Sequence, residues 1–391
     1  RALMEDLSLQ IRPAPLSAPL LSRQLINKYT HLNRINTYID RDLQLTAEQL
    51  ARDNKSLFPA GASIAMMVMK HGAGEVNAYV GSADFSDNSR YGHVDMVAAM
   101  RSPGSTLKPF IYGLALDQGL IHSETLLMDV PLAFKDYRPT NFNVGFSGPV
   151  SVSEALQKSL NIPVVQLLEQ LTPLTFYAKL QSAGAGLILP NGAKPSLAMG
   201  LGGIDIQLQQ LVSLYSSLAN NGEVIAPKFT KQQINKKPKS LLSKEAAWII
   251  RDILLQGDRS RSSQPLAIKT GTSSGYRDAW ALAVTGQYTI GVWVGMPDNA
   301  TMSGHYGAQT AVPLLRALAV RLPQTNDSRF IHSRPDTVQA IPICWPTGAA
   351  ENTYAHLCDQ KRTAWVINEK TPLTLMHTKD SQEQDAKPWL S

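Results

Sequence analysis

Ser105 and Lys108 stand three residues apart, where the sequence predicts the start of a helix after the turn-forming Pro103-Gly104. The residues that follow have the spacing of a buried helix face: Phe110, Ile111, Leu114 and Ala115. Since residues i and i+3 share one helix face, Lys108 can reach the Ser105 hydroxyl. The pair therefore predicts a serine nucleophile and a lysine base, provided that burial or a second cation lowers the pKa of Lys108.

Two further segments offer groups for the same chemistry, namely Ser159-Leu160-Asn161 and Lys269-Thr270-Gly271-Thr272. Alone, a Ser-x-Asn pattern is typical of a helix cap or turn, and Lys-Thr-Gly is typical of a strand end with a bulge glycine. Together and in this order, Ser-x-x-Lys, Ser-x-Asn and Lys-Thr-Gly are the signature of penicillin-binding proteins and serine β-lactamases. Lys269 is our candidate for the second cation beside Lys108.

Longer segments extend this agreement, and through them the chain resembles the transpeptidase domain of class A penicillin-binding proteins. They are Arg101–Phe110, Lys269–Trp280, Gly291–Gly295, Tyr137-x-Pro139-x-Asn141 and Leu197–Gly203. The similarity runs from about Ser63 to Leu322, and the cysteine-bearing tail after it resembles the 1C subgroup of these proteins. The resemblance implies an α+β fold: a five-stranded antiparallel sheet flanked by helices, beside a helical subdomain, with the active site between them.

The chemistry of the side chains gives each motif an expected role. Ser105 attacks a peptide carbonyl, Lys108 takes its proton, and Ser159 relays a proton to the departing amine because a hydroxyl both donates and accepts. The Asn161 amide orients the substrate backbone. Lys269 supplies positive charge that attracts a terminal carboxylate and keeps Lys108 from protonating.

The remaining residues of the third motif are expected to bind substrate. The hydroxyls of Thr270 and Thr272 can donate to the same carboxylate, while Gly271, which has no side chain, lets the substrate lie against the strand. The resemblance also implies an oxyanion hole formed by the backbone N–H groups of Ser105 and Thr272. A second Ser-Asp-Asn match, Ser86-Asp87-Asn88, precedes Ser105 within a cluster of Asp, Asn and Ser that is typical of a loop, so we do not assign it to the site.

Strand-like runs occur at both ends of the region that carries these motifs. Ser63–Met69 and Glu75–Val80 are predicted to form a hairpin around His71–Gly74, and three later runs are predicted as further strands: 267–272, 280–284 and 289–294. These five strands can form one sheet, with the helical middle of the chain carrying Ser159.

The chain divides into three expected parts. Residues 1–55, which contain Pro13, Pro15 and Pro19, are expected to link this chain to an upstream domain that it lacks, and residues 56–325 to form the transpeptidase domain. Residues 326–391 are expected to form a small β-rich module that could be cut short. Its strand candidates are Ile341–Trp345, Ala364–Ile367 and Leu373–Met376.

Cysteine and charge content limit the other functions. Cys344 and Cys358 could form a disulfide in an oxidising compartment or remain two thiols; without a matching histidine pair, we expect no metal site and no cofactor. The net charge of +6 includes a lysine-rich stretch that could face an anionic polymer or lipid headgroups, or be a solvated loop: Lys228, Lys231, Lys236, Lys237 and Lys239. No nucleic-acid-binding module accompanies the charge.

The resemblance implies a peptidoglycan D,D-transpeptidase that forms an acyl-serine with stem peptides ending in D-Ala-D-Ala, transfers them to a neighbouring amine and is acylated by β-lactams. It places the full-length protein in the periplasm, on the outer face of the bacterial inner membrane, held there by an upstream anchor. Cell-wall synthesis partners could bind the C-terminal module. Two alternatives stay open: a hydrolase, either a D,D-carboxypeptidase or a β-lactamase, and a penicillin-binding scaffold with little catalysis.

Overall fold

The computed structural model describes residues 17–134, 137–142, 145–190, 192–258, 266–323, 333–351, 358 and 360–372. Its centre is one antiparallel sheet in the order β2-β1-β9-β8-β7. These strands are β1 (Ser63–Lys70), β2 (Glu75–Val80), β7 (Ala267–Thr272), β8 (Asp278–Val284) and β9 (Tyr288–Gly295). The predicted five-stranded sheet is confirmed, including the hairpin around residues 71–74. Strands β8 and β9 begin slightly earlier than the sequence predicts.

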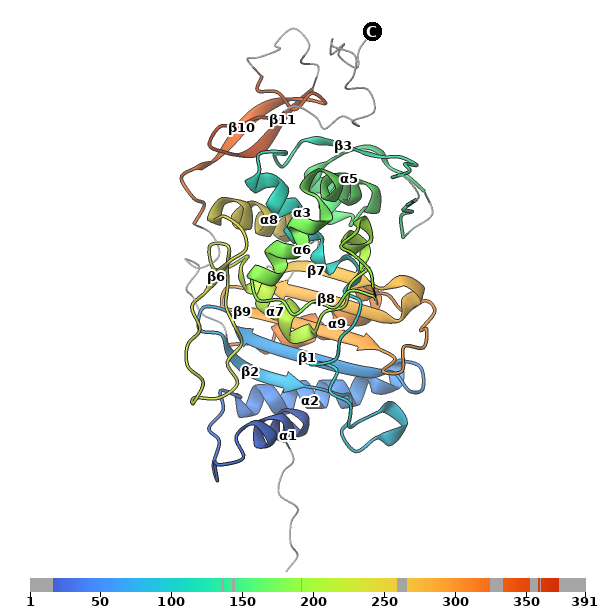
Figure 1. Cartoon of the computed structure of the whole chain (residues 1–391), viewed down its shortest axis with the longest axis vertical. Coiled ribbons are helices and arrows are strands. Elements are labelled where there is room, and N and C mark those ends of the chain that lie inside the picture. The colour runs from blue at the N-terminus through green and yellow to red at the C-terminus, as the bar shows by residue number, and fades with distance from the viewer. Residues whose placement is uncertain are drawn as a thin grey trace, which may run out of the picture.

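Both faces of this sheet are buried. Successive side chains of a strand point to opposite faces, and here the side chains on both faces are largely apolar. On β1, Ile64, Met66 and Val68 belong to one hydrophobic cluster, while Met67 and Met69 belong to another. The first cluster is closed by α2 (Arg41–Asn54) and α9 (Gly307–Ala319), the second by α7 (Leu208–Ser216) and the helical subdomain. The sheet is thus a rigid layer at the centre of the domain (Figure 1).

The helical subdomain lies on the side of the sheet that carries β7 (Figure 1). Its helices are α3 (Lys108–Asp117), α4 (Val152–Gln157), α5 (Asn161–Leu171), α6 (Pro173–Ser182) and α8 (Lys244–Gly257). Two short hairpins accompany them, β3 (Leu126–Asp129) with β4 (Gly148–Ser151) and β5 (Glu223–Val224) with β6 (Lys239–Ser240). Helix α3 packs on both α5 and α8, so the helix that follows Ser105 is held on two sides.

Part of the range expected to be a linker is instead packed into the domain. Helix α1 (Pro19–Lys28) buries Leu21 and Leu25, and α2 buries Leu43, Ala47 and Ala51 against the sheet. The four-residue spacing on α2 places these side chains on one face, which explains why the helix docks. Within the described residues, no helix combines the length and the apolar character needed to span a lipid bilayer.

The C-terminal module is a two-stranded hairpin of β10 (Val338–Trp345) and β11 (Gln360–Ile367), at the end of the molecule opposite α1 (Figure 1). A disulfide joins Cys344 to Cys358, which is the first of the two alternatives for these cysteines. The third strand candidate, residues 373–376, lies outside the described residues. The hairpin contacts the helical subdomain through Trp365, whose indole N–H donates to Asp252 and whose ring packs edge-on against Trp248.

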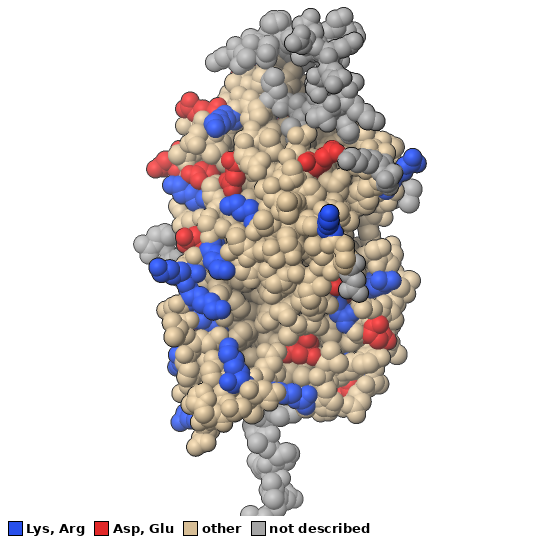
Figure 2. Space-filling model, in the orientation of Figure 1, with Lys and Arg blue, Asp and Glu red and all other residues tan. Residues whose placement is uncertain are grey.

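The lysine-rich stretch includes the connection between β5 and β6. Basic side chains gather along the edge of the molecule that carries β6 (Figure 2). A pocket of about 310 Å³ lies there, and four lysines contribute to its lining: Lys228, Lys236, Lys237 and Lys239. Lys228 also donates to Asn235 and lies over the ring of Tyr38, so this lysine has partners within the fold.

Candidate active site

Ser105 lies in a short 3-10 turn, η3 (Gly104–Leu107), that runs directly into α3. The turn begins at Gly104, whose φ of 54° is a left-handed conformation that glycine adopts without strain. A Cβ at this position would come within 2.5 Å of the carbonyl oxygen of Thr272. Glycine therefore lets the nucleophile turn lie directly against strand β7, and it leaves Ser105 only half-buried.

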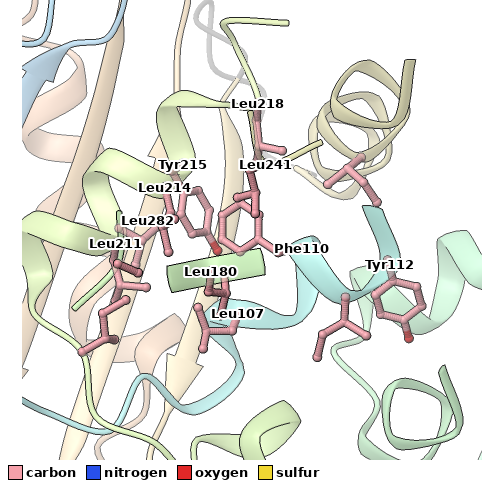
Figure 3. Packing of buried hydrophobic residues seen from close by; sticks show 14 of the residues in the cluster. Leu107, Phe110, Tyr112, Leu180, Leu211, Leu214, Tyr215, Leu218, Leu241 and Leu282 are labelled. Atoms are coloured by element: carbon pink, nitrogen blue, oxygen red, sulfur yellow. The ribbon is translucent and has the colours of Figure 1, made fainter. Parts of the chain in front are cut away.

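Hydrogen bonds and aromatic packing fix this turn from behind. The hydroxyl of Tyr215 donates to the carbonyl of Thr106 at 2.6 Å, and its ring meets Phe110 edge-to-face at 5.3 Å between centroids. Figure 3 shows both rings beside Leu107 and Leu214 in the hydrophobic cluster. On the other side, the indole N–H of Trp280 donates to the carbonyl of Ser102 at 2.8 Å. These contacts hold the turn in place before any substrate arrives.

Lys108 is buried with no exposed surface, and its amine is surrounded by oxygen acceptors. Nζ donates to the carbonyl of Ser159 at 2.6 Å, to that of Leu160 at 2.9 Å and to Oδ1 of Asn161 at 2.6 Å. Burial lowers the pKa of Lys108 well below its ordinary value, and the positive charge of Lys269 lowers it further. Both causes anticipated from the sequence are present, with burial the larger.

Ser159 joins the two lysines. Its carbonyl accepts from Lys108, and its Oγ accepts from Nζ of Lys269 at 2.8 Å. The residue has a φ of 57°, which is unfavourable for a residue with a side chain and persists only where the surroundings hold it. Burial also lowers the pKa of Lys269, to about 7, so its amine can exchange a proton near neutral pH.

Asn161 is the first residue of α5, and all of its polar atoms have partners. Oδ1 accepts from Lys108, Nδ2 donates to the carbonyl of Thr140 at 2.6 Å, and the backbone N–H donates to Oδ1 of Asn141 at 2.9 Å. An amide nitrogen has two protons, so one stays available for the substrate contact that the sequence predicts.

Strand β7 is the edge of the sheet next to η3. The N–H of Ser273 donates to the carbonyl of Asp278, on the side of β8. Successive backbone N–H groups along a strand point in opposite directions, so the N–H of Thr272 points away from β8. On that side lies Gly104: a Cβ added to this glycine would be 2.7 Å from the nitrogen of Thr272. Gly271 is equally restricted, because a Cβ there would lie 2.5 Å from the carbonyl oxygen of Pro103 and 3.4 Å from the nitrogen of Ser105.

The two threonines of this motif differ in their contacts. Oγ1 of Thr272 accepts from the N–H of Gly307 at 3.1 Å, which leaves the hydroxyl proton free to donate. The Cβ of Thr270 lies next to Gly307 as well, and its carbonyl accepts from Lys269 at 2.9 Å. The Thr272 hydroxyl and the Cβ of Thr270 thus both lie against the start of α9.

The structure brings all three sequence motifs together. η3 lies against β7, and Lys108 and Lys269 both bond to Ser159. The Ser86-Asp87-Asn88 match, in contrast, belongs to a surface loop in which Lys55 pairs with Asp84 and Asp87.

Several residues around the site have no role in the sequence interpretation. Asp129 binds the side chain of Asn141 and the carbonyl of Thr140 binds that of Asn161, and the sequence interpretation assigned a role to neither Asp129 nor Thr140. The ring of Phe142, half of whose surface is exposed, lies 5.4 Å from that of Tyr276 and 5.8 Å from that of Tyr306. These contacts join the segment after Asn141 to the turn between β7 and β8 and to the residue that precedes α9.

Comparison with known proteins agrees with this geometry. Residues 64–303 match the penicillin-binding protein transpeptidase domain, and residues 337–366 match the penicillin-binding protein 1C linker domain. Penicillin-binding protein 1C of Escherichia coli (strain K12) is 43% identical over 95% of this chain and 49% of its own length. Penicillin-binding protein 1A of Clostridium acetobutylicum is 29% identical over 70% of the chain and 38% of its own length. The chain thus spans about half the length, or less, of these relatives.

Solved structures share the fold. The penicillin-binding protein PonA1 from Mycobacterium tuberculosis has a TM-score of 0.68 at 21% identity, covering 79% of this chain and 93% of its own. PonA1 has also been solved in complex with penicillin V, with a TM-score of 0.67. The chain therefore belongs to the penicillin-binding protein family, as a class A serine-type transpeptidase domain followed by a penicillin-binding protein 1C linker domain.

Proposed function

We propose that this domain is a D,D-transpeptidase that cross-links peptidoglycan stem peptides through an acyl-enzyme on Ser105. One observation carries the proposal: two buried lysines from different elements bond to the same residue, Ser159, and one of them, Lys108, stands three positions after the half-buried Ser105. Burying an amine costs free energy, and lysines whose pKa is strongly lowered by burial are typical of catalytic sites.

In the acylation step, Oγ of Ser105 bonds to the carbonyl carbon of the penultimate D-alanine while its proton moves to the neutral amine of Lys108. The N–H groups of Ser105 and Thr272 hold the oxyanion, an effect worth about 100- to 1,000-fold per donor. The terminal D-alanine then leaves, and its nitrogen takes a proton from the Ser159 hydroxyl. Lys269 donates a proton to the Ser159 oxygen in its place.

Transfer reverses these proton movements. The amine of a neighbouring strand attacks the ester carbonyl and loses a proton through Ser159 to Lys269. Lys108 returns its proton to Oγ of Ser105, and the free serine is restored. The substrate's terminal carboxylate binds the protonated Lys269 and the hydroxyls of Thr270 and Thr272, with Asn161 holding the peptide backbone.

The same site accounts for β-lactams as ligands, as the PonA1 complex with penicillin V illustrates for a relative. We place the full-length protein in the periplasm, at the outer face of the inner membrane, and we propose that other cell-wall synthesis proteins bind the C-terminal module. Periplasmic oxidation is consistent with the Cys344–Cys358 disulfide.

A β-lactamase is the nearest rival, because it uses the same serine and lysine but adds a glutamate that activates water. Three glutamates follow Ser159 and precede Lys269. Glu169 and Glu223 are exposed, and Glu245 accepts a hydrogen bond from Thr337 in the approach to β10. None of the three has a contact with the site residues among the described interactions, so we favour a long-lived acyl-enzyme.

Fluorescent penicillin tests the assignment of the nucleophile. The wild-type chain should be labelled covalently, Ser105→Ala should not be, and Ser86→Ala should be labelled like the wild type because it changes only the decoy motif. An unlabelled wild-type chain would instead indicate a scaffold without acyl transfer.

Adduct lifetime and product analysis separate the enzymatic alternatives. Intact-mass spectra should show one drug molecule bound for hours, whereas rapid return to the free mass would indicate a β-lactamase. A peptide ending in D-Ala-D-Ala, supplied with and without an amine acceptor, should give the cross-linked product when the amine is present. Release of D-alanine with no cross-linked product would identify a carboxypeptidase.

A further inference from the structure

A chain of hydrogen bonds connects the catalytic amine to a buried carboxylate outside the three motifs. Asp129 ends strand β3, has no exposed surface, and accepts from Nδ2 of Asn141 through both of its oxygens, at 2.8 and 3.0 Å. One of those oxygens also accepts from the N–H of Ser147 at 2.7 Å. Asn141 then accepts from the N–H of Asn161, whose Oδ1 accepts from Lys108.

The carboxylate determines the direction of this chain. An ionised carboxylate only accepts hydrogen bonds, so Asn141 must present its NH₂ group to Asp129 and its oxygen to the N–H of Asn161. Asn161 in turn has its NH₂ group committed to the carbonyl of Thr140, so its oxygen must face Lys108. A reversed Asn141 amide would set its oxygen against the Asp129 carboxylate, and a reversed Asn161 amide would set its oxygen against the carbonyl of Thr140. Either reversal would lose hydrogen bonds, which is costly where water cannot replace them.

This chain of hydrogen bonds ends next to a residue with a strained backbone, Ser159. Asn161 follows Ser159 by two positions, and Ser159 has a φ of 57° with its carbonyl 2.6 Å from Lys108. The first N–H of α5 is one of the groups that a helix cannot satisfy internally, and Asn141 satisfies it from outside the helix. Tying the start of α5 in this way fixes the turn that presents Ser159 to both lysines.

We propose that Asp129 is a positioning residue for acylation: through Asn141 it orients Asn161 and the Ser159 turn so that their oxygens fix the position of the Lys108 amine, the base proposed for Ser105. This proposal rests on the assignment of Lys108 as the base. Asp129 does not touch the amine itself, so it acts through Asn141 and by its charge. The charged groups that act on Lys108 are Lys269, which lowers its pKa, and Asp129, which raises it.

The test uses Asp129→Asn, which keeps the shape but removes the charge and the acceptor-only character. We expect the second-order rate of acylation by fluorescent penicillin to fall by about 10- to 100-fold, since misplacing a reacting group by about 1 Å can cost about 100-fold. The limb of the pH–rate profile that reports Lys108 should also move to lower pH, because the carboxylate that favours the protonated amine is lost.

Two further variants separate positioning from stability. Asp95→Asn removes a carboxylate that is hydrogen-bonded to Tyr79 and Gln24 beside the sheet, away from the three motifs, and should leave the acylation rate and its profile unchanged. The double variant Asp129→Asn with Asn141→Asp exchanges the two side chains. The new carboxylate at position 141 can still accept from the N–H of Asn161, and the new amide at position 129 can donate to that carboxylate. This variant should therefore recover part of the lost rate. Melting temperatures of all variants are measured by circular dichroism.

The outcomes are distinct. A folded Asp129→Asn protein that acylates at the wild-type rate with an unchanged profile overturns the proposal, and so does a rate loss that the exchange variant fails to recover while both variants stay folded. Wild-type protein that is not acylated at all overturns the proposed function instead.

Discussion

Ser159 is the residue that both buried lysines contact. Its backbone carbonyl faces Lys108 and its hydroxyl faces Lys269, so one residue accepts hydrogen bonds from both amines through different atoms. A residue with a relaxed backbone would direct these atoms differently, which explains the positive φ at this position. The separation lets one lysine be neutral while the other keeps its proton.

The pH dependence of acylation follows from these two lysines. Lys108 must lose its proton to act as base, so kcat/KM rises with pH through its lowered pKa. Lys269 must keep its proton to hold a substrate carboxylate, so kcat/KM falls as pH rises through about 7. Because kcat/KM reports the free enzyme, we expect a bell-shaped profile for a peptide substrate.

Lys269→Arg checks the descending limb of that profile. An arginine stays protonated throughout, so the limb near pH 7 should disappear even if the maximal rate falls. Stopped-flow acylation or D-alanine release between pH 5 and 10, values chosen to bracket the normal range of lysine and histidine titration, gives the profile. A descending limb that persists unchanged in the arginine variant would assign it to another group.

For single residues, the sequence indicated candidates for the reacting groups, a role that stays a prediction, but it did not indicate the residues that hold them in place. Ser105, Ser159 and Lys269 stand in motifs whose order and side-chain chemistry point to acyl transfer. Asp129 and Thr140 could not be recognised, because a buried carboxylate at a strand end and a backbone carbonyl leave no pattern until the fold brings them to Asn161.

At the scale of elements, the candidate site depends on the contact between strand β7 and the turn η3, which carries Ser105. A free strand edge leaves backbone groups unpaired, and here the turn η3 lies against part of that edge. Two glycines, Gly104 and Gly271, allow the close approach of the two backbones. The contact between β7 and η3 therefore depends on the absence of two Cβ atoms.

Gly271→Ala tests this dependence. The new methyl group would collide with backbone and with Thr106, so we expect a loss of stability of about 1–3 kcal/mol, typical of overpacking, together with slower acylation. Gly72→Ala in the β1–β2 turn is the matched control, because nothing lies within 4 Å of its added Cβ. Thermal denaturation and fluorescent penicillin labelling compare the two variants. Equal behaviour would mean that the turn and the strand can separate freely.

Elements were predictable where a pattern is local. Alternating apolar residues and turn glycines indicated all five strands of the sheet, and their pairing matched the expected single sheet. Helix α2 was missed although Leu43, Ala47 and Ala51 recur at helical spacing, because the prolines before it suggested a linker. Its docking against the sheet is a tertiary contact, which local composition does not reveal.

For the whole molecule, the main question is how the 1C linker module relates to the catalytic domain. The hairpin contacts the segment before β3 and helix α4 as well as α8: the backbone of Trp365 exchanges hydrogen bonds with Ser123, and Arg362 pairs with Glu124 and with Glu154 of α4. Helix α4 ends at Gln157, just before Ser159. The module could thus brace the segment that carries the site, but Asn141 and Asp129 hold that segment from the other side.

Trp365→Ala distinguishes bracing from simple attachment. Replacing a core tryptophan costs about 3–5 kcal/mol, and Trp365 is only partly buried, so we expect the free energy of unfolding to fall by about 2 kcal/mol. Acylation of Ser105 should slow by less than about threefold, which corresponds to under 1 kcal/mol, because the hydrogen bonds from Asp129 to Lys108 do not pass through the module. Leu174→Ala, at an exposed position on α6, is the control for truncating an apolar side chain. Chemical denaturation and fluorescent penicillin kinetics measure both quantities on the same preparations.

A loss of acylation beyond tenfold in a Trp365 variant that keeps its melting temperature would contradict this expectation. It would mean that the linker module helps to set the geometry of Ser159. A partner bound to the module could then control cross-linking.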